Sequence, residues 1–153
     1  MKQKLNNRPA VILLVEDNPA DQRLTARALE NSKVEIDLRI ACDGQEALDY
    51  LNRINQFSTQ SIAPFPDLII LDINMPKMSG KEFLKHIRSV NEFKRIPVIM
   101  FSTSEHQHDV EEAYDLGVNS YITKPEDIKS FYDVFEKLED FWLRTTVLPT
   151  SNI

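Results

Sequence analysis

Residues 68–80 read LIILDINMPKMSG, and the aspartate inside this stretch decides how the chain is interpreted. Four apolar residues, Leu68 to Leu71, run directly into Asp72. A short segment that is apolar at every position is typical of a strand buried on both faces of a parallel sheet. A carboxylate that follows such a strand lies at the carboxyl end of the sheet, where ligands bind in open α/β folds.

Strand and helix patterns alternate along the whole chain. The expected strands lie at residues 11–15, 34–40, 68–71, 98–101 and 120–123. The expected helices, some with a leading turn, occupy residues 18–30, 42–54, 79–90, 108–117 and 126–144. Residues 34–40 alternate apolar and charged side chains, which is typical of a strand near a sheet edge, and residues 55–66 form a long loop. This order predicts an α/β fold with a doubly wound parallel sheet covered by helices on both faces.

The length suits a single domain. The chain has 153 residues, and we expect the domain at residues 10–148, between a loose polar arm (1–9) and a short tail (149–153). The formal net charge of −6 disfavours broad nucleic-acid binding, so we expect no direct contact with DNA. We expect the one cysteine, Cys42, in the core of a cytoplasmic protein. Neither a secretory signal nor an apolar run of about 18 residues is seen, so no membrane contact is expected.

Polar side chains follow the expected strands at their carboxyl ends. They are Glu16 and Asp17 after the first strand, Asp72 after the third, Ser102 and Thr103 after the fourth, and Lys124 after the fifth. Because parallel strands end at one rim, three carboxylates converge there. Two like charges about 4 Å apart repel by about 4 kcal/mol at an effective dielectric near 20, and Lys124 neutralises only one of them. Mg²⁺, which prefers oxygen ligands and phosphate, is therefore the expected metal.

This rim suits phosphoryl chemistry. Asp72 is placed to attack phosphorus and form an acyl phosphate, since carboxylates serve as covalent nucleophiles. Lys124 and a hydroxyl would contact the phosphoryl oxygens. Each residue alone has a simpler interpretation as a helix cap, a turn former or a solvated lysine. Their joint occurrence at successive strand ends favours the functional interpretation.

Four motifs resemble the receiver domains of bacterial two-component response regulators. They are VILLVEDNPADQRL, DLIILDINMPKMSG, IPVIMFSTS and YITKP, within a resemblance that covers about residues 9–140. It implies a flavodoxin-like (βα)5 sandwich with strand order 2-1-3-4-5. It also implies that Asp72 accepts a phosphoryl group from a sensor histidine kinase in a Mg²⁺-dependent reaction. Such a protein is not classed as an enzyme, although it catalyses its own phosphorylation and dephosphorylation.

The resemblance also assigns a metal site. Asp17 matches the direct carboxylate ligand of Mg²⁺, beside the phosphoacceptor Asp72. Glu16 matches an acidic neighbour that acts through a metal-bound water, although many receivers have aspartate there. Asn74 matches the residue whose backbone carbonyl completes the site.

Further positions match the parts that respond to phosphorylation. Ser102 matches the switch hydroxyl, and Thr103 matches a neighbour that is usually smaller. Tyr121 matches the aromatic side chain that moves inward with the hydroxyl, although it could also be a simple edge aromatic. Lys124 matches the lysine that contacts the phosphoryl group, and the bond from it to Pro125 is expected to be cis.

Two features resemble the small response regulators of cyanobacterial phytochromes. They are the long loop at residues 55–66 and the ending FEKLEDFWLRTTVLP. This implies a phytochrome histidine kinase as phosphodonor. Since no DNA-binding module follows, we expect a stand-alone receiver that signals through a changed protein-contact surface. The alternatives are a relay that passes phosphate to a histidine phosphotransfer protein, and a degenerate receiver that only binds partners.

The last expected helix carries more apolar residues than one buried face needs. Ile128, Phe131, Phe135, Leu138 and Trp142 form one stripe, and Tyr132, Val134, Phe141 and Leu143 lie off it. The surplus predicts a homodimer through the face formed by residues 108–117, 120–123 and 126–144. The expected interface residues are Phe131, Tyr132, Val134, Phe141 and Trp142. A tail that folds back over this surplus is the alternative.

Other classes of site fit less well. A phosphatase of the haloacid dehalogenase type would carry a second aspartate two residues after the first, where this chain has Asn74. A nucleotide-binding domain would need a glycine-rich phosphate loop, but the chain has three glycines and no such loop. His106 and His108 could form a metal pair, but histidines in a polar loop are more often solvated.

Overall fold

One parallel sheet forms the centre of the molecule in the computed structural model, which describes residues 1–59 and 61–150. The strands are β1 (Ala10–Val15), β2 (Ile36–Ala41), β3 (Leu68–Leu71), β4 (Val98–Ser102) and β5 (Ser120–Thr123). Their order is β2-β1-β3-β4-β5, and each neighbouring pair is parallel. The predicted fold class and strand order are confirmed, and β2 lies at a sheet edge as expected.

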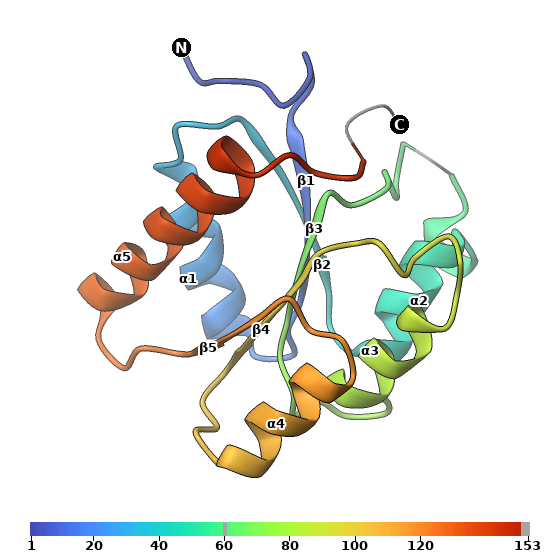
Figure 1. Cartoon of the computed structure of the whole chain (residues 1–153). Helices are drawn as coiled ribbons and strands as arrows, with labels where there is room; N and C mark the ends of the chain where they lie inside the picture. The colour runs from blue at the N-terminus through green and yellow to red at the C-terminus, as the bar shows by residue number, and fades with distance from the viewer. Residues whose placement is uncertain (60, 151–153) are drawn as a thin grey trace.

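Helices cover both faces of the sheet. They are α1 (Pro19–Glu30), α2 (Gly44–Asn52), α3 (Gly80–Arg88), α4 (Gln107–Asp115) and α5 (Ile128–Glu139), with a 3-10 turn at Asn55–Phe57 and a π-helical turn at Asp140–Thr145. Figure 1 shows α1 and α5 on one face and α2, α3 and α4 on the other. The predicted doubly wound arrangement follows from this alternation of faces.

Local sequence explains where the helices begin and end. The side chain of Asn18 caps α1 by accepting hydrogen bonds from the backbone N–H groups of Ala20 and Asp21, and Pro19 takes the first helical position. Asp43, Ser79 and Asp127 cap α2, α3 and α5 in the same way. Gly117, with φ of +98°, follows α4 and ends it as predicted.

The core lies on both sides of β1, β3 and β4, in which every residue is buried. On the face covered by α1 and α5, Phe101 meets the rings of Phe131 and Phe135 at centroid distances of 5.4 and 5.3 Å. Phe131 is only 2% exposed, so its predicted place in a dimer interface is wrong: its ring fills the core instead. Ile128 was expected on the core stripe, but it is 61% exposed because it is the first residue of α5.

The end of the last helix differs from the prediction. A single helix was expected as far as Arg144, but α5 ends at Glu139 and the chain continues as a π-helical turn. This wider turn changes the angular position of the residues after Glu139. Leu143, which was expected off the core stripe, is therefore buried, while Phe141 is exposed.

Both terminal segments are attached to the domain, although a loose N-terminal arm was expected. Gln3 donates its backbone N–H to Lys33 and accepts from the N–H of Glu35, so the arm pairs with the chain beside β2. Thr150 is buried and its hydroxyl donates a hydrogen bond to the carboxylate of Asp67. These two segments lie at the same end of the sheet (Figure 1). Residues 151–153 of the predicted tail lie outside the described residues.

Three local predictions can be compared with the structure. Cys42 is exposed rather than buried, because it follows the last residue of β2 at the sheet edge. The Lys124–Pro125 bond is trans, as is every peptide bond in the described part of the chain, and trans is the intrinsically preferred form. In the described residues 55–59 and 61–66 the chain is a loop, as expected, apart from the 3-10 turn at Asn55–Phe57. The Tyr50 hydroxyl holds this loop by donating a hydrogen bond to the carbonyl of Pro64.

Within residues 1–59 and 61–150, no helix is long and apolar enough to cross a bilayer.

Candidate functional site

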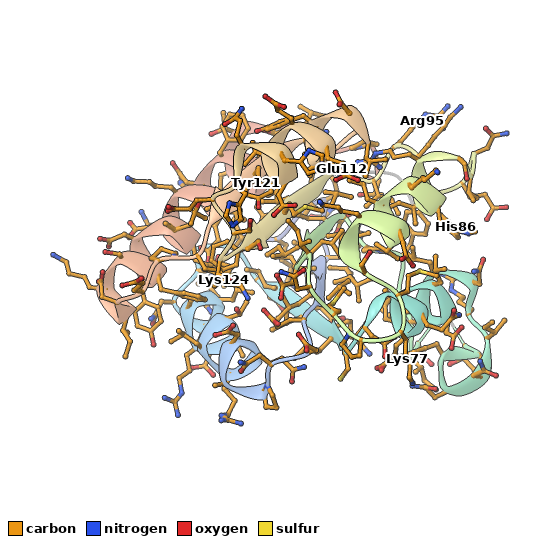
Figure 2. The ribbon with its side chains drawn as sticks, turned by 90° about the horizontal axis from the view of Figure 1, so that it is seen from below. Lys77, His86, Arg95, Glu112, Tyr121 and Lys124 are labelled. Carbon is orange, nitrogen blue, oxygen red and sulfur yellow. The ribbon has the colours of Figure 1, made fainter. Side chains whose placement is uncertain are left out.

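Three carboxylates meet where β1 and β3 end. Glu16 and Asp17 directly follow β1, and Asp72 directly follows β3. One oxygen from each lies within 4.8 Å of the others. Figure 2 views the molecule from this end, with Lys124 and Tyr121 labelled. The sequence prediction that these three residues converge is confirmed, and their hard oxygen donors match the preference of Mg²⁺ or Mn²⁺.

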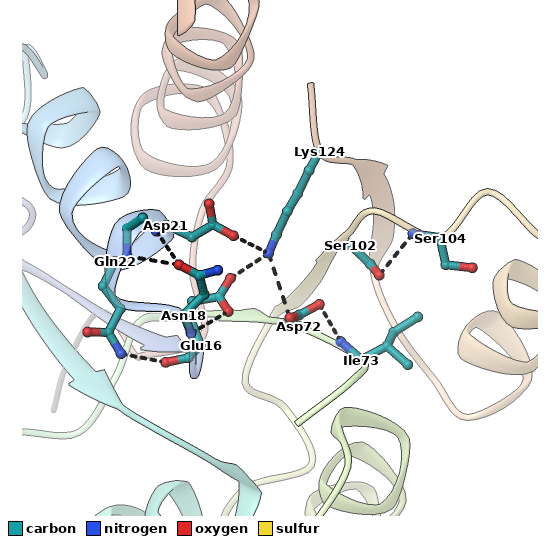
Figure 3. Close-up of polar contacts among 10 residues, drawn as sticks. Glu16, Asn18, Asp21, Gln22, Asp72, Ile73, Ser102, Ser104 and Lys124 are labelled. Carbon is teal, nitrogen blue, oxygen red and sulfur yellow. Dashed lines mark hydrogen bonds and ion pairs between the residues drawn. The ribbon is translucent and has the colours of Figure 1, made fainter. Parts of the chain in front are cut away.

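Lys124 joins the carboxylates from the end of β5. Its ammonium lies 2.5 Å from Oε1 of Glu16, 3.0 Å from Oδ2 of Asp21 and 3.6 Å from Oδ2 of Asp72. Figure 3 shows the lysine reaching between α1 and Asp72. The Lys124 side chain is only 8% exposed, so these contacts are shielded from water. The structure thus places Lys124 in the predicted cluster.

Burial shifts the pKa values of this cluster. It raises the pKa of Glu16 to about 7, while the hydrogen bond and charge of Lys124 act in the opposite direction. Burial also raises the pKa of Asp72, again opposed by Lys124. Burial alone would lower the pKa of Lys124, but its hydrogen bond to Glu16 and the charges of Asp72 and Glu16 raise it. The lysine therefore stays protonated, and a cation at the rim would favour the ionised carboxylates.

A close backbone approach fixes Asp72 against α3. A Cβ atom added to Gly80 would lie 2.0 Å from the carbonyl oxygen of Asp72. The Asp72 side chain accepts a hydrogen bond of 2.8 Å from the backbone N–H of Ile73. The backbone N–H of Asp72 donates to the carbonyl of Val15. Asp72 is thus bonded to β1 and lies directly against the first residue of α3. A larger residue at position 80 would push α3 and Asp72 apart.

The predicted switch residues lie along β4 and β5. Ser102 is the last residue of β4 and is 1% exposed, and its hydroxyl accepts a hydrogen bond from the N–H of Ser104. The hydroxyl of Tyr121 donates to the carbonyl of Ser104 at 2.9 Å. The half-buried Tyr121 ring also packs against the core under α2, α3 and α4. Ser104 therefore connects the two predicted switch residues in the structure.

Four other residues named from the sequence have no defined role in the structure. Asn74 is exposed in the loop after Asp72, and its ligand role stays a prediction. Thr103 is exposed beside Ser102. His106 and His108 are both exposed, and Nε2 of His108 lies 3.4 Å from a carboxylate oxygen of Glu112.

Asp21 is a site residue that sequence reasoning missed. It lies in the first turn of α1, four residues after Asp17, and contacts a lysine 103 positions further along the chain. The available signal was its helical spacing, since a residue one turn into α1 shares the rim with the residues just before the helix.

Comparison with known sequences identifies relatives along nearly the whole chain. The model of the response regulator receiver domain matches residues 12–136. Response regulator Rcp1 of Synechocystis is 40% identical over 146 residues, which are 95% of this chain and 97% of that protein. The probable methanogenesis regulatory protein FilR2 of Methanothrix harundinacea is 36% identical over 135 residues, with 88% and 84% coverage.

Solved structures give the same result. The phosphorylated cyanobacterial phytochrome response regulator RcpA has a TM-score of 0.86 and 43% identity, and covers 92% of this chain and 99% of its own. The Mn²⁺-bound form of Rcp1 has a TM-score of 0.85 and 40% identity, with the same coverage. The similarity therefore extends beyond the core of the fold to most of both chains.

Proposed function

The chain belongs to the response regulator receiver family, and from this membership we propose that it accepts a phosphoryl group on Asp72 from a sensor histidine kinase. One observation carries the proposal: Asp72 lies in a cluster with Glu16, Asp17 and the protonated Lys124. A degenerate receiver would have lost one of these groups. The cluster instead combines a nucleophile, two further carboxylates and a cation.

The transfer forms one bond and breaks another. A carboxylate oxygen of Asp72 bonds to phosphorus while the P–N bond of the donor phosphohistidine breaks, and its electron pair stays on the imidazole nitrogen. Lys124 and the hydroxyl of Ser102 contact the phosphoryl oxygens. The chain contributes mainly by positioning these groups and neutralising charge.

Glu16, Asp17 and Asp72 would hold Mg²⁺, with the backbone carbonyl of Asn74 as a further ligand. Their hard oxygen donors, within 4.8 Å of one another, fit this ion. When bound, Mg²⁺ would neutralise charge on the phosphoryl group and the carboxylates.

The signal leaves the site through a population shift. Ser102 is drawn toward the phosphoryl oxygens, and Ser104 follows because its N–H is bonded to Ser102. Tyr121, which donates to the carbonyl of Ser104, then changes position and with it the surface of α4, β5 and α5. The output is a changed contact surface for another protein.

The proposed phosphodonor is a phytochrome histidine kinase. The support is the similarity to RcpA, a phytochrome response regulator, and to Rcp1, each over nine-tenths of this chain or more. The kinase identity can be tested by comparing transfer rates from an autophosphorylated phytochrome kinase and from an unrelated sensor kinase. The phytochrome kinase should phosphorylate Asp72 faster by at least tenfold, and equal rates would contradict the pairing.

We also propose a homodimer through the α4–β5–α5 face. An apolar groove of about 300 Å³ is lined by Ile122, Val134, Lys137, Leu138, Phe141 and Trp142. Phe141 is 53% exposed and lies against Trp142, so a second copy could cover both rings. Phe141→Glu should lower the dimer fraction in analytical ultracentrifugation, whereas Val147→Glu, also at an exposed position, should not. An unchanged dimer, or a monomeric wild type, would contradict this interface.

The experiment that tests the proposed function is intact mass spectrometry after incubation with acetyl phosphate and Mg²⁺. The wild type should gain one phosphoryl group, and the gain should be lost with a chelator and in Asp72→Asn. If no adduct formed even with a cognate kinase supplied, the proposed phosphorylation would be wrong, and the remaining function would be that of a receiver that only binds partners.

A further inference from the structure

Lys124 has a carboxylate partner outside the predicted metal cluster. We propose that Asp21 holds the Lys124 ammonium on the α1 side of the rim, away from Asp72, and so slows phosphorylation. Asp21 is in this view a positioning residue that acts through Lys124. The inference rests on the proposed phosphorylation of Asp72.

The distances show which carboxylates hold the lysine. Its ammonium donates hydrogen bonds to Glu16 at 2.5 Å and to Asp21 at 3.0 Å, whereas 3.6 Å to Asp72 is too long for a hydrogen bond. Figure 3 shows Glu16 and Asp21 together on one side of the ammonium and Asp72 on the other. The lysine is thus held by the residues of β1 and α1.

The start of α1 fixes Asp21 in this position. Asn18 accepts from the N–H of Asp21, and the N–H of Asn18 itself donates to Glu16. Asn18 therefore fixes the carboxylate of Glu16 and the backbone of Asp21, the two residues that accept hydrogen bonds from Lys124. Two of the three N–H donors of the ammonium are committed to these acceptors, and moving the ammonium toward Asp72 lengthens both of these hydrogen bonds.

A simpler role for Asp21 is to stabilise α1, since carboxylates in a first helical turn interact favourably with the helix dipole. Glu46 and Glu82 occupy the same position in α2 and α3. Neither has a contact with Lys124 among the ion pairs of the described residues. Glu82 therefore provides a control for the helix effect, at a helix that begins beside Asp72.

The two roles predict opposite effects on phosphorylation. If Asp21 only stabilised α1, its loss would leave the rate unchanged or lower it. If Asp21 withholds Lys124, its loss frees the ammonium for the incoming phosphoryl oxygens. The Asp21 side chain is 31% exposed, so its ion pair with Lys124 is modest in strength and the increase in rate should be about three- to tenfold.

The test compares initial rates of phosphorylation by acetyl phosphate with Mg²⁺, followed by intact mass on the full chain. Asp21→Asn should be about three- to tenfold faster than the wild type. Asp21→Glu, which keeps a carboxylate near the ammonium, should stay within about twofold of the wild type. Glu82→Gln should also stay within twofold, since it removes a first-turn charge without touching Lys124.

Each other outcome overturns the inference. An unchanged or slower Asp21→Asn would mean that Asp21 does not withhold the lysine. A similar rate increase in Glu82→Gln would mean that any lost carboxylate near the rim reduces repulsion of the anionic donor. A similar rate increase in Asp21→Glu would mean that the shape of the side chain at position 21, not its charge, controls the rate. A wild type without any adduct would instead refute the proposed function itself.

Discussion

Glu139 is a buried carboxylate whose ionisation should lower the stability of the fold. It is the last residue of α5, is only 6% exposed, and bonds to the buried Ser32 between α1 and β2. Burial raises its pKa to about 7, with a smaller contribution from Glu136, while the hydrogen bond to Ser32 and the charge of Lys2 act in the opposite direction. The perturbation we propose is Glu139→Gln, which keeps the shape and removes the charge.

The magnitude follows from the two pKa values. A rise from 4.5 to about 7 corresponds to about 3 kcal/mol. Between these pH values the folded state holds a proton that the unfolded state has released, so stability falls as pH rises through this window. Glu139→Gln should therefore match the wild type near pH 4.5 and exceed its free energy of unfolding by about 1–3 kcal/mol at pH 8.

The assay is urea unfolding at several pH values, followed by the fluorescence of Trp142, which lies three residues after Glu139. Glu16 also has a pKa of about 7, but it is present in both proteins, so its effect cancels in the comparison. Glu136→Gln, an exposed change one turn earlier, should alter stability by less than about 0.5 kcal/mol. A Glu139→Gln variant that is less stable at pH 8, or a difference in stability that does not depend on pH, would show that ionised Glu139 does not destabilise the fold.

Three further predictions concern the ends of the sheet. Asp67 is fully buried and bonded to both terminal NH groups of Arg8, so Asp67→Asn should lower the free energy of unfolding by about 3–5 kcal/mol in urea titrations; a loss under 1 kcal/mol would contradict this. Gly80→Ala should prevent phosphorylation and lower the melting temperature, because its Cβ would overlap the Asp72 carbonyl; normal values of both would show that the backbone adjusts. Cys42 should react with a thiol reagent in the folded protein, whereas protection until unfolding would place it in the core.

The fold was predictable because its strands carry strong signals. β1 and β3 are apolar at every position, and each is followed by a carboxylate where the sheet ends. The carboxyl ends of parallel strands lie at the same edge of the sheet, so the proximity of Asp17 and Asp72 could be predicted from the sequence alone. The capping side chain of Asn18 likewise marked the start of α1.

Other features depend on contacts that side-chain patterns do not encode. Gln3 pairs with the chain beside β2 through its backbone N–H and carbonyl groups. Every residue other than proline has both groups, so the sequence gives no sign of which residue will pair. The π-helical turn after Glu139 shifts the helix phase, so Leu143 is buried although a regular helix would place it off the core stripe. The contact of Asp21 with Lys124 joins residues 103 positions apart, and only the packed fold brings them together.

The most direct test of the central claim identifies the atom that carries the phosphoryl group. After phosphorylation with acetyl phosphate and Mg²⁺, borohydride reduces an acyl phosphate on aspartate to homoserine, which peptide mass spectrometry can locate. We expect homoserine at position 72 alone, and none when Mg²⁺ is chelated. Homoserine at position 17, or none anywhere despite a phosphoryl adduct, would contradict the assignment of Asp72 as the phosphoacceptor.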